Sequence, residues 1–172
     1  MVNNLVKNQA NLDSSEAFTT IPPMVQQLLD EAAAAYSQAN RAEAILWSAQ
    51  AMYPDCLPVY FALYKFYFYK GHLHDAERAT RLGLAKASRQ AGFASDWHSL
   101  TTETTNWTDT RGPQHFYLFS LKALAFICLR LGRRSESRAI LSKLAQIDPG
   151  DSVGASVIQD LVAGSENHPP QM

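Results

Sequence analysis

The stretch LPVYFALYKFYFYKGHLHDAERATRLGLAKA, residues 57–87, decides the fold. Its apolar residues recur with a spacing close to 3.6, which predicts one helix over 57–70 and a second over 75–89. Gly71 and His72 separate them, because a glycine can adopt the left-handed conformation that ends a helix. Asp75 suits the start of the second helix, where a carboxylate interacts favourably with the helix dipole. The stretch therefore predicts a pair of helices joined by a tight turn.

The same signals continue on both sides of this pair. Proline at 22 and 23 favours a helix start, Asn40 and Pro54 are expected breaks, and Gly132 ends a later helix. No segment alternates convincingly as a strand would, so we expect an all-α protein. Further helices are expected over 24–39, 41–52, 114–131, 135–147 and 152–163, the last with Val153, Val157, Ile158 and Leu161 on one side.

These elements predict one helical domain over 23–163, between a flexible N-terminal arm over 1–22 and a flexible tail over 164–172. The Thr-rich stretch over 92–113 interrupts the helical pattern and contains two of the three tryptophans. Loops of more than about 12–15 residues in a compact array are usually functional or disordered. Two large apolar rings argue against disorder, so Trp97 and Trp107 are expected either to hold this insert on the helices or to contact a partner.

The helix pairs share a repeated pattern. Residues 57–87 contain Leu63, Tyr67, Gly71, Ala76 and Gly83; residues 117–149 contain Leu124, Ala125, Gly132, Leu141, Leu144 and Pro149; an earlier pair matches more weakly through Ala32, Ala35, Ala44, Ala51 and Pro54. From Ala44 to Ala76 is 32 positions, close to the roughly 34 of a tetratricopeptide repeat. Over 24–149 the chain resembles a tetratricopeptide-repeat (TPR) protein, which implies three repeats, a long insertion between the second and third, and a C-terminal capping helix.

Composition excludes several classes of protein. The 172 residues have a formal net charge of −1, which argues against a basic nucleic-acid-binding module. The longest apolar runs contain a lysine and are too short to cross a bilayer, and the first 20 residues hold no secretory signal. Cys56 and Cys128 are too far apart for a CxxC motif or a disulfide framework. These features predict a cytoplasmic protein that contacts neither nucleic acid nor membrane.

No motif for catalysis, cofactor or metal stands out. The chain has no Gly-rich phosphate loop, GxSxG or HExxH. The insert gathers Asp96, His98, Glu103 and Asp109, which we interpret as a solvated loop with capping side chains, and His72 and His74 as surface histidines. We therefore expect no enzyme activity, no cofactor and no metal; an enzyme that uses His98 and Asp96 is the alternative from another class.

Binding is the stronger prediction. In a TPR array the first helix of each pair lines a groove, and here those helices mix aromatic rings with cations. Such a surface suits an extended or helical peptide that carries acidic groups. The candidate partner-binding residues are Phe61, Lys65, Phe68, Tyr69, Trp97, Trp107, Phe119, Lys122, Phe126, Arg130, Arg133 and Arg134.

Charge is unevenly spread along the chain. Residues 111–147 carry seven Lys and Arg residues against one acid, Glu136, whereas both ends of the chain are acidic. This basic segment would attract an acidic partner, and salt would weaken the attraction. The alternative, which the sequence leaves open, is a solvated helix face partly neutralised by the C-terminal acids.

A narrower resemblance rests on LYKFYFYKGHLHDAER, GFASDWHSL and GPQHFYLFSLKALAFICLRLG. These stretches resemble the nitrogenase-associated factor T group of small TPR proteins, which accompany nitrogen-fixation genes in diazotrophic bacteria. The resemblance implies a non-catalytic accessory factor that binds the nitrogenase molybdenum–iron protein in an immature, damaged or cofactor-deficient form. The alternative is a TPR chaperone of the type III secretion kind, which would hold an extended substrate segment.

Overall fold

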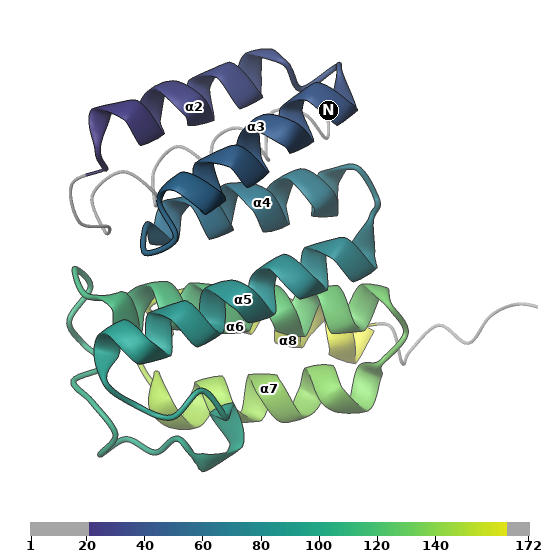
Figure 1. Cartoon of the computed structure of the whole chain (residues 1–172). Helices are drawn as coiled ribbons and strands as arrows, with labels where there is room; N and C mark the ends of the chain where they lie inside the picture. The colour runs from purple at the N-terminus through teal and green to yellow at the C-terminus, as the bar shows by residue number, and fades with distance from the viewer. Residues whose placement is uncertain (1–20, 165–172) are drawn as a thin grey trace, which may run out of the picture.

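The computed structural model describes residues 21–164 and is entirely helical there, with no strand in that range. Within these residues, seven α-helices follow one another in antiparallel succession, with one 3-10 turn between α5 and α6 (Figure 1). They are α2 (Pro23–Ala34), α3 (Ala39–Met52), α4 (Leu57–Tyr69), α5 (Leu73–Ala91), η1 (Trp97–Ser99), α6 (Pro113–Arg130), α7 (Arg134–Ile147) and α8 (Ser156–Gly164). The expected all-α array is confirmed.

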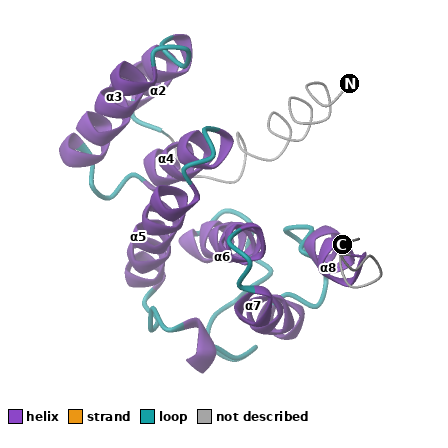
Figure 2. Cartoon of the chain, turned by 90° about the vertical axis from the view of Figure 1, so that its right-hand side faces the viewer, coloured by secondary structure: helices purple, strands orange, loops and turns teal. Residues whose placement is uncertain are grey.

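The alternate helices α2, α4, α6 and α8 form one layer, in which each contacts the next. Helix α4 contacts α2 and α6, and α6 also contacts α8. The intervening helices α3, α5 and α7 each pack between two members of that layer. Figure 2 shows the array turned to view several helices near their ends. This layering brings α4 and α6 side by side although 43 residues separate their ends.

Glycine permits two features of the central pair that the sequence predicted. Gly71 has φ +78° and follows the end of α4, where the His72 amide donates to the Tyr67 carbonyl. Gly83 lies on α5 where a Cβ would stand 3.1 Å from the Tyr60 Cβ on α4. A side chain at position 83 would therefore push α5 away from α4 and α6.

The first helix ends earlier than expected. Helix α2 stops at Ala34, not at residue 39, and Asn40 lies inside α3 and does not break a helix. The turn falls within an alanine-rich run that contains no local stop signal. Ala32, Ala35 and Ala42 are all buried, so contact between α2 and α3 sets the position of the turn.

The last helix begins later than expected, at Ser156 and not at residue 152. Asp151 (φ +51°) and Gly154 (φ +68°) are left-handed, and the Asp151 carboxylate accepts hydrogen bonds from the backbone amides of Ala155 and Ser156. The predicted apolar side of this helix is only half correct, because Val153 and Ile158 are buried but Val157 and Leu161 are not. Ile158 and Val162 face the core, whereas Val157 and Leu161 are 57% and 48% exposed.

Two further findings concern membrane-spanning helices and the two ends of the chain. No helix within residues 21–164 is both long enough and apolar enough to cross a membrane. The predicted flexible arm lies outside the described residues except for Ile21 and Pro22, and the predicted tail lies outside them except for Gly164.

Candidate functional site: the face of helices α4 and α6

Helix α4 carries a row of aromatic and cationic side chains. Phe61, Lys65 and Phe68 follow a 4–3 spacing, which places them on one side of the helix. The Lys65 ammonium lies 4.7 Å from the centre of the Phe61 ring. Burial lowers the pKa of Lys65, because a cation loses hydration when it is removed from water. The row therefore presents a cation that the fold keeps partly desolvated.

Helix α6 carries a matching row. Phe119, Lys122, Phe126 and Arg130 follow a 3–4–4 spacing on one side of that helix. The Lys122 ammonium lies 5.0 Å from the centre of the Phe119 ring and also donates to the Val153 carbonyl before α8. Although partial burial pushes the pKa of Asp151 upward, hydrogen bonds from Ser156 and Ala155 and the charge of Lys122 together lower it, so Lys122 also interacts with this carboxylate.

The two rows join into one surface. Phe68 and Phe126 have ring centres 5.2 Å apart, and the Arg130 guanidinium lies 5.7 Å from the centre of the Phe68 ring. Tyr69, which is 49% exposed, meets Phe68 edge to face. We call this surface the aromatic–cationic face; its residues are Phe61, Lys65, Phe68, Tyr69, Phe119, Lys122, Phe126 and Arg130.

The face can bind a segment that combines carboxylates with apolar side chains. Cations above ring faces are attracted to the π electrons, and desolvated cations pair strongly with carboxylates. The half-buried rings offer apolar area between the charges. The sequence predicted all eight residues of this face, but it did not predict Lys70. The Lys70 ammonium lies 3.8 Å from the centre of the Tyr36 ring and extends the pattern toward α2.

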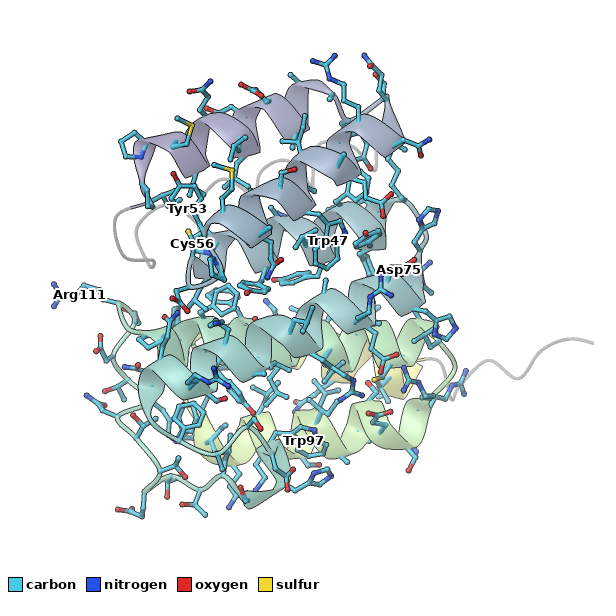
Figure 3. All side chains as sticks on the ribbon, in the orientation of Figure 1. Trp47, Tyr53, Cys56, Asp75, Trp97 and Arg111 are labelled. Carbon is cyan, nitrogen blue, oxygen red and sulfur yellow. The ribbon has the colours of Figure 1, made fainter. Side chains whose placement is uncertain are left out.

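Trp97 and Trp107 do not join this face. Their side chains are only 8% and 5% exposed and belong to the same core as Phe116 and Leu121 of α6. Helix η1 packs against α7, and Figure 3 shows Trp97 there. The prediction that these two rings contact a partner is therefore wrong, because burial leaves almost no ring surface to bind one.

Two hydrogen bonds join the insert to the helices, and a third closes the insert on itself. The Trp107 indole donates to the Thr101 carbonyl (2.9 Å), Tyr117 of α6 donates to the Ser95 carbonyl (3.2 Å), and Lys143 of α7 donates to the Leu100 carbonyl (2.7 Å). Phe93 completes the contact with α6, because its ring centre lies 5.0 Å from that of Tyr117. The alternative in which the tryptophans hold the insert is the one that the structure supports.

Arg133 and Arg134 also lie apart from the face, at the start of α7. Arg133 pairs with Glu77 of α5 and, at 3.1 Å, with Glu136, and Arg81 bridges the same two carboxylates at 2.8 Å each. We call these four residues the α5–α7 ion-pair network. Arg134 is exposed and stands outside it. The basic segment is thus partly neutralised by Glu77 and Glu136, and its Lys122 also interacts electrostatically with Asp151, one of the C-terminal acids.

The residues considered for catalysis are only partly brought together. Asp96 and His98 form a 2.8 Å contact on the exposed side of the insert, and the His98 hydrogen bond lowers the pKa of Asp96. The His98 ring stacks on Trp97 with centres 3.6 Å apart. Within residues 21–164, no three His, Cys, Asp or Glu residues are grouped to hold a metal ion. Burial raises the pKa of Cys56 and raises that of Cys128 to about 12, which disfavours both thiolates.

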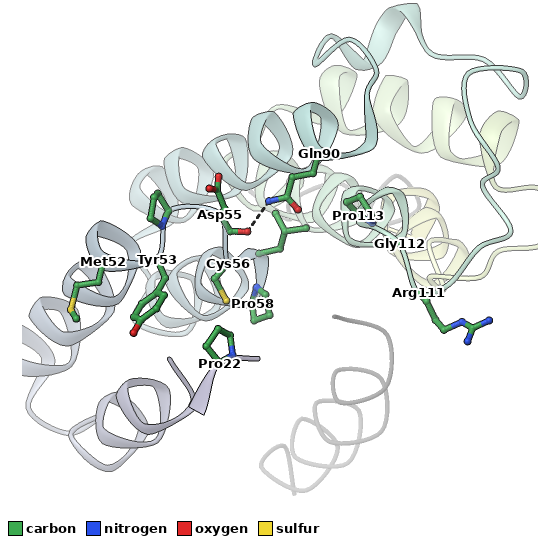
Figure 4. Close-up of a pocket in the computed structure, with 12 residues that line it drawn as sticks. Pro22, Met52, Tyr53, Asp55, Cys56, Pro58, Gln90, Arg111, Gly112 and Pro113 are labelled. Atoms are coloured by element: carbon green, nitrogen blue, oxygen red, sulfur yellow. Dashed lines mark hydrogen bonds between the residues drawn. The ribbon is translucent and has the colours of Figure 1, made fainter. Parts of the chain in front are cut away.

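A pocket of about 450 Å³ opens where several elements begin or end (Figure 4). Pro22 before α2, Tyr53 and Cys56 between α3 and α4, and Pro113 at the start of α6 all line it. Gln90 of α5 closes one side by donating to the Asp55 carbonyl (2.7 Å), while the Arg111 side chain points away. No sequence motif marks this pocket, because its lining comes from four separate stretches of chain.

Comparison with known proteins gives one curated relative. The chain is 31% identical over 124 residues to the "Uncharacterized 19.8 kDa protein in nifW 5'region" of Azotobacter chroococcum mcd 1. The match covers 71% of this chain and 70% of that protein. No family model matches the chain, and no solved structure matches it. By this identity and coverage, the chain belongs to the same family as the 19.8 kDa protein of the Azotobacter nifW 5' region.

Proposed function

We propose that this protein is a non-catalytic accessory factor of nitrogen fixation, and that the aromatic–cationic face is the surface by which it binds another protein. The observation that carries the proposal is the contact of Phe68 with Phe126, which joins two rows of rings and cations into one surface. The family relative supports the cellular context, since its name places it in a nif region.

The partner in this proposal is the nitrogenase molybdenum–iron protein, in an immature, damaged or cofactor-deficient form. The chemistry of the face favours an acidic segment with apolar side chains between its carboxylates. Charge complementarity of this kind speeds association and fixes register, and burial of rings adds affinity. Neither Lys65 nor Arg130 forms an ion pair with the described residues, so both can pair with carboxylates of a partner.

The proposal includes a TPR-like character for the array. The antiparallel helix pairs, the left-handed glycine after α4 and after α6, and the close approach at Gly83 support it. In such arrays the first helix of each pair forms the binding surface, which is the position of α4 and α6. The exposed Asp96–His98 pair also suits a loop contact better than an enclosed active site, and this supports the non-catalytic part of the proposal.

A charge-reversal experiment tests the face. The variant K65E/K122E/R130E is expected to lose at least about tenfold of the molybdenum–iron protein recovered in a pull-down from nitrogen-fixing cells, because three attractions become repulsions. The matched control reverses three exposed cations away from the face, R41E/R89E/R134E, and is expected to keep recovery within about twofold. Circular dichroism checks that both variants keep their helicity.

Two outcomes would count against the proposal in different ways. Equal recovery by the wild type and the face variant would place partner binding elsewhere on the molecule. Recovery of no nitrogenase subunit by the wild type would remove the molybdenum–iron protein as the partner.

A further inference from the structure

Two cations of the aromatic–cationic face have a defined separation. Lys65 and Arg130 form no ion pair within residues 21–164. The Lys65 ammonium lies over the Phe61 ring and the Arg130 guanidinium over the Phe68 ring. Phe61 and Phe68 are seven residues apart on α4, which is about 10 Å along a helix. The face therefore holds two positive charges about 10 Å apart along α4.

Aromatic rings occupy the interval between these two cations. Phe68 stands three residues beyond Lys65 on α4, and Phe126 stands four residues before Arg130 on α6. The two rings have their centres 5.2 Å apart with planes tilted by 39°, and both are half-buried. A ligand that pairs with both cations must therefore cover apolar ring surface between its two charges.

The face offers little that could pair with a peptide backbone. Among its eight residues the only neutral polar group is the Tyr69 hydroxyl, and no Asn, Gln, Ser or Thr is present. The backbone groups in the middle of α4 and α6 are used within each helix. An extended segment would lose water from its amides and carbonyls here without gaining partners, which costs binding free energy. A helical segment pairs its backbone internally and presents only side chains, so this surface favours a helix.

We infer that the segment recognised by the aromatic–cationic face is an amphipathic α-helix with carboxylates at positions i and i+7 and apolar side chains at i+3 and i+4. Seven residues of helix rise about 10 Å, which matches the separation of the two cations, and these four positions share one side. One carboxylate pairs with Lys65 and the other with Arg130, while the apolar side chains cover Phe68 and Phe126. The inference rests on the proposed function, because it specifies the segment by which a protein partner binds.

Synthetic peptides test the inference on the full-length protein without nitrogenase. The first is a helix of about 15 residues, stapled on its far side because short helices are marginal in water, with glutamates at i and i+7 and leucines at i+3 and i+4. The control has the same composition and staple, but its second glutamate stands at i+5, which is turned about 140° from the first. Fluorescence anisotropy is expected to give the first peptide an affinity at least about fivefold higher, the size of one ion pair.

Protein variants locate the two pairs of charges. K65M and R130M are each expected to lower the affinity for the i/i+7 peptide about fivefold and to remove its advantage over the control peptide. R134M, which removes an exposed cation outside the face, is expected to leave that advantage unchanged. Circular dichroism checks that each variant keeps its helicity.

A third peptide tests the helical conformation itself. It lacks the staple and has proline at i+5, which breaks the helix, and it is expected to bind at least about fivefold more weakly than the first. Tighter binding by this peptide would make the ligand an extended segment. Equal affinities of the i+7 and i+5 peptides, or an advantage that survives in K65M and R130M, would overturn the spacing. No binding by either stapled peptide would overturn the helix as the ligand. The pull-down of the molybdenum–iron protein is a separate measurement, so failure of this inference and failure of the proposed function are distinguished.

Discussion

Two groups of cations in this molecule look alike in the sequence and differ in the structure. In the α5–α7 ion-pair network, Arg81 and Arg133 stand between the carboxylates of Glu77 and Glu136. On the aromatic–cationic face, Lys65 and Arg130 stand over phenylalanine rings. The first group balances its charge inside the fold, whereas Lys65 and Arg130 form no ion pair within residues 21–164. A count of basic residues therefore overstates the charge available for binding.

The two groups also differ in whether folding favours or disfavours the charged form of their side chains. Although partial burial pushes the pKa of Glu77 upward, hydrogen bonds from Arg133 and Arg81 hold it below its usual value. Folding thus favours the charged carboxylate, and the network stabilises the contact between α5 and α7. The pKa of Lys65 is also lowered, but for a lysine this has the opposite effect on stability, because burial disfavours its charged form. Its charge costs stability, which is the expectation for a residue kept for binding.

The largest change in the free energy of unfolding is expected from a variant that breaks the α5–α7 ion-pair network. R133E places a third carboxylate beside Glu77 and Glu136 and is expected to lower the free energy of unfolding by about 2 kcal/mol. R134E, a reversal at the exposed neighbouring residue, is expected to change it by less than about 0.5 kcal/mol. Urea denaturation followed by circular dichroism measures both. Equal losses for the two variants would show that the network contributes nothing of its own.

A smaller effect appears as a pH dependence. Because the pKa of Glu77 is lower in the folded protein than its usual 4.5, its stabilisation is present above about pH 4.5 and is lost as the pH falls through the lowered value. E77Q is expected to cost about 1 kcal/mol at pH 7 and to lose less stability than the wild type on acidification. Denaturation series from pH 7 to pH 3 compare the two proteins. Parallel curves would contradict the assignment.

The smallest expected effect on stability lies on the face. K65M keeps most of the side-chain volume and removes a charge that burial disfavours. Its free energy of unfolding is expected to stay within about 0.5 kcal/mol of the wild type or to rise, while pull-down of the partner weakens. A loss of more than about 1 kcal/mol would mean that Lys65 serves the fold, and the contrast between the two groups would fail.

Much of the fold could be predicted because its signals are local. Gly71 and Gly132 end their helices in the left-handed conformation, and Pro113 lies at the first position of α6. The turn after α2 could not be predicted, since alanines carry no stop signal and the packing of Ala35 against its neighbours decides it. The late start of α8 depends on the backbone amides that Asp151 caps, a detail that apolar spacing does not reveal.

The candidate site was predictable to a similar degree. The 4–3 and 3–4–4 spacings placed each row of rings and cations on one side of its helix. Spacing alone could not show that Trp97 and Trp107 are core residues, because an aromatic ring in a loop suits a core and an interface equally well. Nor could it pair Arg133 with Glu77, which lies 56 residues away.

The sequence by itself determined the helical class, most helix boundaries and the residues of the aromatic–cationic face, because these depend on periodicity and on glycine and proline over a few residues. Only the tertiary structure decided which cations are neutralised, which tryptophans are buried, and that the starts of α4 and α6 share a pocket with Pro22. Those outcomes depend on distances between segments far apart in the chain. Such distances are set when helices pack, and no local pattern encodes them.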